Sequence, residues 1–232
     1  MPAHLRPCAP IARDAIVCGD PSRALAIAQA VLPAPRMSNH HRGLWGYYGE
    51  TGGGGELTVQ ATGIGGPSAV TVLSELTELG VRRVIRVGTC AVAGAEPALG
   101  SRLVVTRAIS RDGTSAALGS EPGGEVLPDP VLTAALAEAT GAQTTGLVSR
   151  DLQPTAEDLH PPSAPSGEPA ADLQTAAVFA FAARRGIAAA ATVVVTVTGG
   201  RRLEDEPVEA ALLDLAAGAA AVLALPQPQL EV

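Results

Sequence analysis

The stretch ATGIGGPS, residues 61–68, decides the fold because it joins two elements of opposite type. Glu56–Thr62, which runs into it, is predicted as a strand that forms a hairpin with Leu44–Tyr48, because the two flank the glycine run Gly52–Gly55. An amphipathic helix is predicted from the end of the stretch to about Leu79, and Gly80 is expected to close it. Glycines at such a junction allow a ligand to approach the backbone closely.

Outward from this junction, the chain continues to alternate strands and helices. The predicted strands are Ala15–Cys18, Leu44–Tyr48, Glu56–Thr62, Arg83–Val87, Arg102–Ile109, Gln143–Ser149 and Thr192–Thr198. The other predicted helices are Arg23–Leu32 capped by Ser22, Pro130–Thr140, Ala171–Arg185 and Glu206–Leu225. Residues 111–128 are predicted as a loop, and residues 151–170 as a loop long enough to form a lid. This alternation predicts one α/β domain over residues 1–232 with a mostly central sheet.

Composition and charge narrow the classes of function. The chain has 232 residues, 47% of them hydrophobic, which is enough for one sizeable core. Its net charge is −7, and an acidic chain of this kind is not expected to bind nucleic acid non-specifically. The three cysteines have no CxxC spacing, which argues against a disulfide framework and against a zinc site.

Neither end of the chain predicts insertion in a membrane. The N-terminal segment has no apolar signal core. The most apolar stretch, Val208–Leu225, contains Glu209 and Asp214 and falls short of a clean membrane span. We therefore expect a cytoplasmic protein with no membrane partner.

Three motifs at predicted strand ends carry the residues suited to chemistry. They are Cys18–Arg23, residues 61–68, and Arg86–Cys90. Ligands of open α/β sheets bind beyond the carboxyl ends of strands, and helix N-termini that follow favour anions. Arg23 and Arg86 offer forked donors that suit phosphate, and Arg86 stands in an apolar strand where an unpaired charge is costly. The alternative is that the glycines only form tight turns and the arginines are only solvated.

Other kinds of site have less support. A dinucleotide-binding fingerprint would have glycine where Ser68 stands, and Val81–Val87 offers no acidic residue for a ribose hydroxyl. The sequence contains no GxSxG motif, so a serine hydrolase has little support. The histidines lack the spacing of metal ligands, so no metal site is predicted.

Taken together, the three motifs resemble the nucleoside phosphorylase family, and uridine phosphorylases in particular. The family's hallmark stretches PGDPxR, STGIGGPS and RxGTTG stand here as CGDPSR, ATGIGGPS and RVGTCA. The likeness covers roughly residues 4–200. It implies a three-layer α/β/α fold around a mixed, partly barrel-like sheet. It also implies a homo-oligomer, either a dimer or a hexamer built of dimers, whose active sites are shared between subunits.

The resemblance places a phosphate site and catalytic residues on this chain. Phosphate-binding positions are Gly19, Arg23, Arg86 and Thr89, with Arg42 reaching in from the neighbouring subunit. Arg86 and Thr89 are also expected to be catalytic, together with Gln174. Inorganic phosphate is the implied co-substrate, and no other cofactor is expected.

The ribose and base positions depart from the family. His4, Leu173 and Gln174 match ribose-binding positions, but Gln174 replaces a glutamate whose charge complements a cationic transition state. For that reason Gln174→Glu is expected to raise the rate constant. Base-binding positions are expected at four residues: Cys90, Ala91, Gln153 and Glu157. The catalytic aspartate of purine enzymes is replaced by Gly199.

These positions imply phosphate-dependent cleavage of the N-glycosidic bond of a nucleoside, of pyrimidine type or modified, to free base and ribose 1-phosphate. Two alternatives remain open. One is a hydrolase of the same fold, against which the retained arginines argue, since water needs no anion pocket. The other is a catalytically weak or silent homologue that binds a nucleoside or phosphate, which the changes at Gln174 and Gly199 favour.

Overall fold

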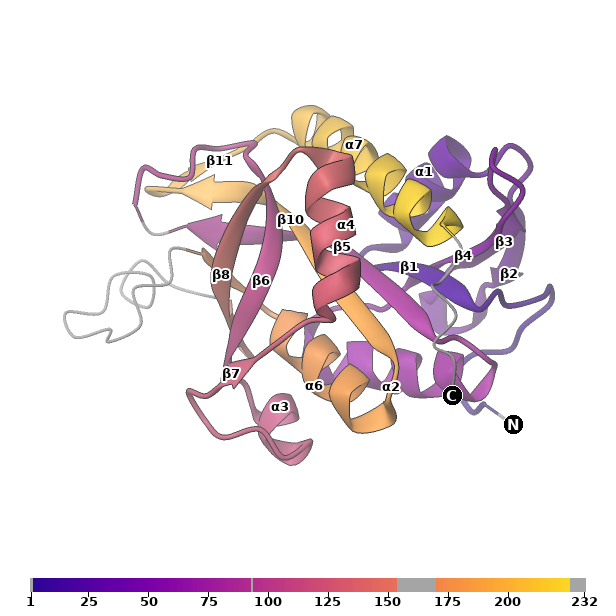
Figure 1. Ribbon diagram of the computed structural model, residues 1–232, viewed down its shortest axis with the longest axis horizontal. Helices are drawn as coiled ribbons and strands as arrows, with labels where there is room; N and C mark the ends of the chain where they lie inside the picture. The colour runs from indigo at the N-terminus through magenta and orange to yellow at the C-terminus, as the bar shows by residue number, and fades with distance from the viewer. Residues whose placement is uncertain (1, 93, 154–169, 226–232) are drawn as a thin grey trace.

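A computed structural model describes residues 2–92, 94–153 and 170–225 of the chain. A mixed sheet lies between two layers of helices (Figure 1). The helices are α1 Pro21–Val31, the short 3₁₀ helix His41–Gly43, α2 Gly65–Glu78, α3 Gly113–Ala117, α4 Pro130–Thr140, α6 Thr175–Arg185 and α7 Asp205–Ala224. The strands are β1 Asp14–Cys18, β2 Arg36–Asn39, β3 Gly46–Glu50, β4 Glu56–Ala61, β5 Arg83–Val92, β6 Arg102–Arg111, β7 Glu125–Val126, β8 Gln143–Arg150, β9 Ala170–Asp172, β10 Ala188–Thr198 and β11 Arg201–Arg202.

The sheet is open at one end and closed into a barrel at the other. Its order is β11-β10-β6-β8-β9-β5-β1-β4-β3-β2, and β7 pairs with β6. An additional pairing of β10 with β5 closes a ring of five strands, β5-β10-β6-β8-β9. The expected mixed, partly barrel-like sheet is therefore present.

One strand, β5, belongs to both parts of the sheet. Its first half pairs with β1 as far as Arg86, and its last residues pair with β9 from Ala91 onward. Strand β10 follows it along its whole length on the other side. Between Arg86 and Ala91, β1 and β9 diverge from the same edge of β5. Such a divergence at the ends of parallel strands leaves room for a ligand.

Each face of the sheet buries its own apolar cluster. Helices α2 and α6 cover one face, where Leu73, Phe179 and Val193 are buried. Helices α1, α4 and α7 cover the other, where Ile16, Leu136 and Leu212 are buried. Helix α7 is long and apolar enough to span a membrane, but 56% of its apolar window is buried. It contacts β1, β5 and β10, which accounts for its composition as a core helix.

Several predicted elements need correction. Helix α1 begins at Pro21 and is capped by Asp20 rather than Ser22, because the Asp20 carboxylate accepts from the backbone N–H groups at the helix start. Residues 111–128 are not all loop, since they contain α3 and β7. Residues 88–90 lie inside β5 rather than after it. The helix predicted from Ala171 starts four residues later, because Ala170–Asp172 forms β9.

Candidate functional site

Three of the predicted motifs meet at the divergence of β1, β5 and β9. Strand β1 lies between β4 and β5, and all three run parallel. The residues that follow β1 and β4 therefore emerge on the same side as Arg86. The glycine loop and the end of β1 are in close contact, since a Cβ atom on Gly19 would lie 3.3 Å from the carbonyl oxygen of Gly63.

Arg86 forms a buried ion pair at this place. Its Nη2 lies 2.9 Å from Oδ2 of Asp172, and the two side chains are 7% and 1% exposed. The side chain lies along its own strand, because a Cβ on Gly88 would be 1.4 Å from Nη1 of Arg86. Glycine at position 88 is thus required by the position of the guanidinium. Among the described residues, Nε and Nη1 of Arg86 are buried without a hydrogen-bond partner.

Asp172 is held by more than Arg86. Its Oδ1 accepts from the Ser149 hydroxyl at 2.6 Å, and its Oδ2 accepts from the Thr175 hydroxyl at 2.6 Å. Backbone N–H groups of Gln174 and Thr175 also donate to it, both at 3.2 Å. The carboxylate is therefore fixed by β8 and by the start of α6 at once. The sequence motifs did not assign Asp172 a role, although a buried acid beside a predicted ligand position was a usable signal.

Arg23 lies on the helix that directly follows β1. It stands in the first turn of α1 and is half-buried. Burial raises the pKa of the Cys18 thiol to about 12, while the charges of Arg23 and Arg86 both oppose that rise. Both guanidinium groups are thus close enough to act on one atom at the end of β1. The start of α1 is not itself a free anion site, because Asp20 occupies its first N–H groups and hydrogen bonds there lower its pKa despite burial.

Gln174 joins α6 to the glycine loop, the segment around Gly63 and Gly65 between β4 and α2. Its Nε2 donates to the carbonyl oxygens of Gly63 at 2.6 Å and Gly65 at 3.2 Å. The side chain is buried, and its Oε1 lies on the side of Gly19. The amide therefore holds the loop through its nitrogen and leaves its oxygen toward the end of β1. A glutamate cannot make the two bonds to carbonyl groups. Gln174 precedes α6 rather than standing in its first turn.

The remaining positions on β5 and before α6 differ in exposure. Thr89, Ala91 and Leu173 are half-buried, and no hydrogen bond joins Thr89 to Arg86 within the described residues. Cys90 is buried, and its pKa is raised to about 12, first by burial and then by the charge of Asp172. At neutral pH it is therefore a neutral thiol.

The N-terminal segment is tied to α2. Glu75 accepts from the backbone N–H groups of Ala3, His4 and Leu5, and from the His4 ring at 2.8 Å. Burial opposes ionisation of Glu75, but these hydrogen bonds lower its pKa to about 2. His4 is therefore fixed, and its side chain remains 40% exposed. Sequence reasoning did not identify Glu75 as its partner.

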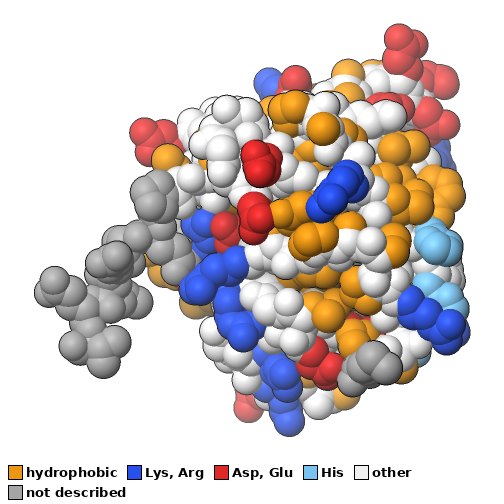
Figure 2. Space-filling model, turned by 90° about the vertical axis from the view of Figure 1, so that its right-hand side faces the viewer, with side chains coloured by type: hydrophobic (Ala, Val, Ile, Leu, Met, Phe, Trp, Pro, Cys, Tyr) orange, Lys and Arg blue, Asp and Glu red, His pale blue; other side chains and the backbone are white. Residues whose placement is uncertain are grey.

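Arg42 projects from the surface near the histidines. It is exposed and adopts a left-handed conformation with φ 59°. Partial desolvation and the charges of Arg6 and Arg42 lower the pKa of His41. Histidine and arginine side chains gather along one edge of this face in Figure 2. Among the described residues, no ion pair joins Arg42 to an acidic side chain.

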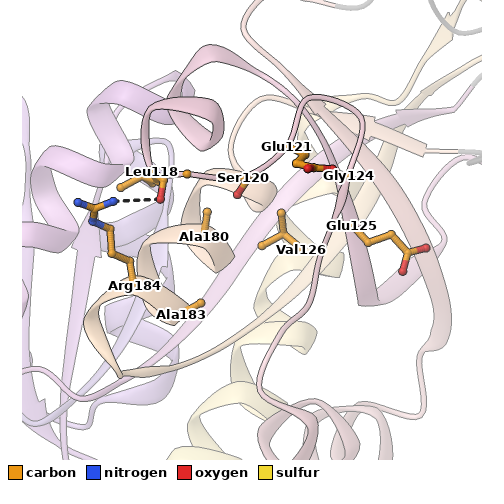
Figure 3. A pocket seen from close by; sticks show the side chains of 10 residues that line it. Leu118, Ser120, Glu121, Gly124, Glu125, Val126, Ala180, Ala183 and Arg184 are labelled. Atoms are coloured by element: carbon orange, nitrogen blue, oxygen red, sulfur yellow. Dashed lines mark hydrogen bonds between the residues drawn. The ribbon is translucent and has the colours of Figure 1, made fainter.

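Two predicted base-binding positions lie at or beyond the limit of the described chain. Gln153 is exposed and is the last described residue before position 154. Glu157 lies outside the described residues, as does most of the predicted lid. Gly199 is exposed in the turn between β10 and β11. A surface pocket of about 590 Å³ lies between α3, β7 and α6 (Figure 3), but no predicted site residue lines it.

Comparison with known proteins gives the same family across most of the chain. The family model described as phosphorylase superfamily matches residues 13–225. A DeoD-type purine nucleoside phosphorylase of Oceanobacillus iheyensis is 43% identical over 34% of this chain and 34% of its own length. A uridine phosphorylase of Salmonella typhimurium is 38% identical over 45% of this chain and 40% of its own. A guanosine phosphorylase of Halorubrum lacusprofundi is 34% identical over 44% of this chain and 41% of its own. The aligned stretches thus span less than half of each relative.

Proposed function

Because the chain belongs to the phosphorylase superfamily, we propose that it is a pentosyltransferase that cleaves the N-glycosidic bond of a nucleoside with inorganic phosphate. The observation that supports this most is the buried guanidinium of Arg86, with two unpartnered nitrogen donors beside the end of β1. Buried donors of this kind are satisfied by an anion. Arg23 adds a second positive charge nearby.

In the proposed reaction, a phosphate oxygen attacks the anomeric carbon while the bond to the base breaks, and the base leaves with the bonding electrons. Arg23, Arg86 and Thr89 hold the phosphate, and Arg42 of the partner subunit adds a fourth contact. Gln174 accepts a hydrogen bond from a ribose hydroxyl through Oε1. Positioning of the two reactants and the electrostatic fit to the oxocarbenium-like transition state supply the rate. The products are the free base and ribose 1-phosphate.

The base is proposed to be of pyrimidine type or modified, bound near Cys90, Ala91, Gln153 and Glu157. The similar proteins include uridine, purine and guanosine phosphorylases, so the choice of base needs its own measurement. The test is to follow base release from uridine, thymidine, inosine, adenosine and guanosine, with and without phosphate. We expect release from at least one nucleoside, strictly dependent on phosphate and yielding ribose 1-phosphate. Release that ignores phosphate and yields free ribose would identify a hydrolase instead.

A silent nucleoside-binding or phosphate-binding protein is the second candidate. The amide nitrogen of Gln174 is committed to the carbonyl groups of the glycine loop, and no carboxylate stands in its place. A cationic transition state would lack that charge. Binding of phosphate without base release from any nucleoside of the panel would favour this candidate over an enzyme.

A further inference from the structure

The carboxylate of Asp172 lies where it determines the direction of the Arg86 side chain. We propose that Asp172 is a positioning residue: it fixes the Arg86 guanidinium so that its remaining nitrogens face an anion bound where β1 and β9 diverge. The inference rests on the proposed function, because that anion is the phosphate of the reaction. It goes beyond that function because it assigns a task to a residue that need not touch the substrate.

The ion pair uses only one nitrogen of the guanidinium. Nη2 contacts Asp172, while Nε and Nη1 are buried with no partner among the described residues. A guanidinium carries donors on all three nitrogens, so most of them remain for an anion. The pair therefore leaves the binding capacity of Arg86 in place and sets only its orientation.

The guanidinium is restrained by the backbone at Gly88 and by the side chain of Asp172. It lies against Gly88, where a Cβ would approach Nη1 to 1.4 Å. Asp172 in turn is immobilised by Ser149 of β8 and Thr175 of α6. Three elements thus hold one arginine, and donation to a phosphate depends on such a fixed direction.

Removing the charge of Asp172 leaves a buried guanidinium without a counter-ion. A buried unpaired charge is costly, so Arg86 is expected to turn toward solvent rather than stay over Gly88. Its contacts to phosphate are then lost in both the ground state and the transition state. Such uniform loss raises the Michaelis constant for phosphate more than it lowers the rate constant.

The experiment compares native protein with Asp172→Asn. Both Michaelis constants and the rate constant are measured, and inorganic phosphate is titrated into each protein by calorimetry without nucleoside. We expect the constants for phosphate to rise about tenfold or more, and the Michaelis constant for the nucleoside to change less than about twofold. Asp14→Asn is the matched control, because Asp14 pairs with Arg83 at the far end of β5. It is expected to lower stability and leave phosphate binding unchanged.

Gly88→Ala provides an independent test that leaves the contacts of Asp172 with Ser149 and Thr175 in place. Its added Cβ would displace the guanidinium at Nη1, so the same rise in the constants for phosphate is expected. The test therefore remains available if Asp172→Asn does not fold. If native protein binds phosphate and folded Asp172→Asn binds it equally well or more tightly, Asp172 does not position Arg86. The same result with folded Gly88→Ala would show that the direction of the guanidinium does not govern phosphate binding, which also overturns the proposal. If native protein neither binds phosphate nor requires it for base release, the proposed function itself fails.

Discussion

Gln174→Glu is the substitution for which the structure changes the expected result most. Resemblance to the family alone suggested that the added charge would accelerate the reaction. In the structure, however, Nε2 of Gln174 donates to the carbonyl oxygens of Gly63 at 2.6 Å and Gly65 at 3.2 Å. An ionised glutamate would place an acceptor against two acceptors in a buried position. We therefore expect the variant to be less stable and no faster.

The size of the effect follows from the two bonds. Each hydrogen bond contributes about 1 kcal/mol net, and a buried carbonyl left without a donor costs about 1–3 kcal/mol. Gly63 and Gly65 are half-buried, so the lower end of that range applies to them. Two carbonyl groups at about 1 kcal/mol each give an expected loss of about 2 kcal/mol, which for a domain of this size lowers the melting temperature by about 4–8 °C.

The assay is thermal unfolding of native protein and variant, combined with the rate constant on the nucleoside panel. Protonation of the new glutamate restores one donor, so the loss of stability should be smaller at acid pH than at neutral pH. Gln60→Glu is the matched control, because the buried Gln60 amide also donates to backbone carbonyl groups, those of Leu44 and Ala61. It should show a similar loss of stability. If the Gln174→Glu protein has the melting temperature of the native protein and a higher rate constant, holding the glycine loop is not the role of Gln174.

Three other predictions address the N-terminus, the thiols and the subunit contact. Glu75→Gln should lower stability at neutral pH. Because the pKa of Glu75 is depressed, the difference in free energy of unfolding between native protein and variant should vanish as pH falls from about 4.5 through about 2. Denaturant unfolding across that pH range measures it. Iodoacetamide at neutral pH should modify the exposed Cys8 and spare Cys90, whose pKa is about 12, and peptide mass spectrometry showing rapid labelling of Cys90 would contradict its burial. Mixing Arg42→Ala chains with Arg23→Ala chains should recover activity in hybrid dimers, since one hybrid site escapes both changes, whereas no recovery after proven subunit exchange would exclude a shared site.

Local signals in the sequence determined the element types and the position of the motifs. The α4 helix was predicted with its observed bounds, because Pro130 begins it and Gly141 takes the left-handed conformation after its end. The three glycine-containing motifs were recognised at strand ends, and the strands that carry them, β1, β4 and β5, are parallel neighbours in the sheet. These features depend on residues a few positions apart, which is the range over which sequence patterns act.

Tertiary structure alone decided which partners the site residues have. Asp172 comes 86 residues after Arg86 in the sequence, and only the pairing of β9 with β5 brings them together. The helix predicted from Ala171 begins late for the same reason, because pairing with β5 and β8 draws Ala170–Asp172 into the sheet. Gln174 likewise acquires its role from a loop 109 residues away. Burial and strand pairing set these contacts, and neither is expressed in the local pattern that propensities and motifs describe.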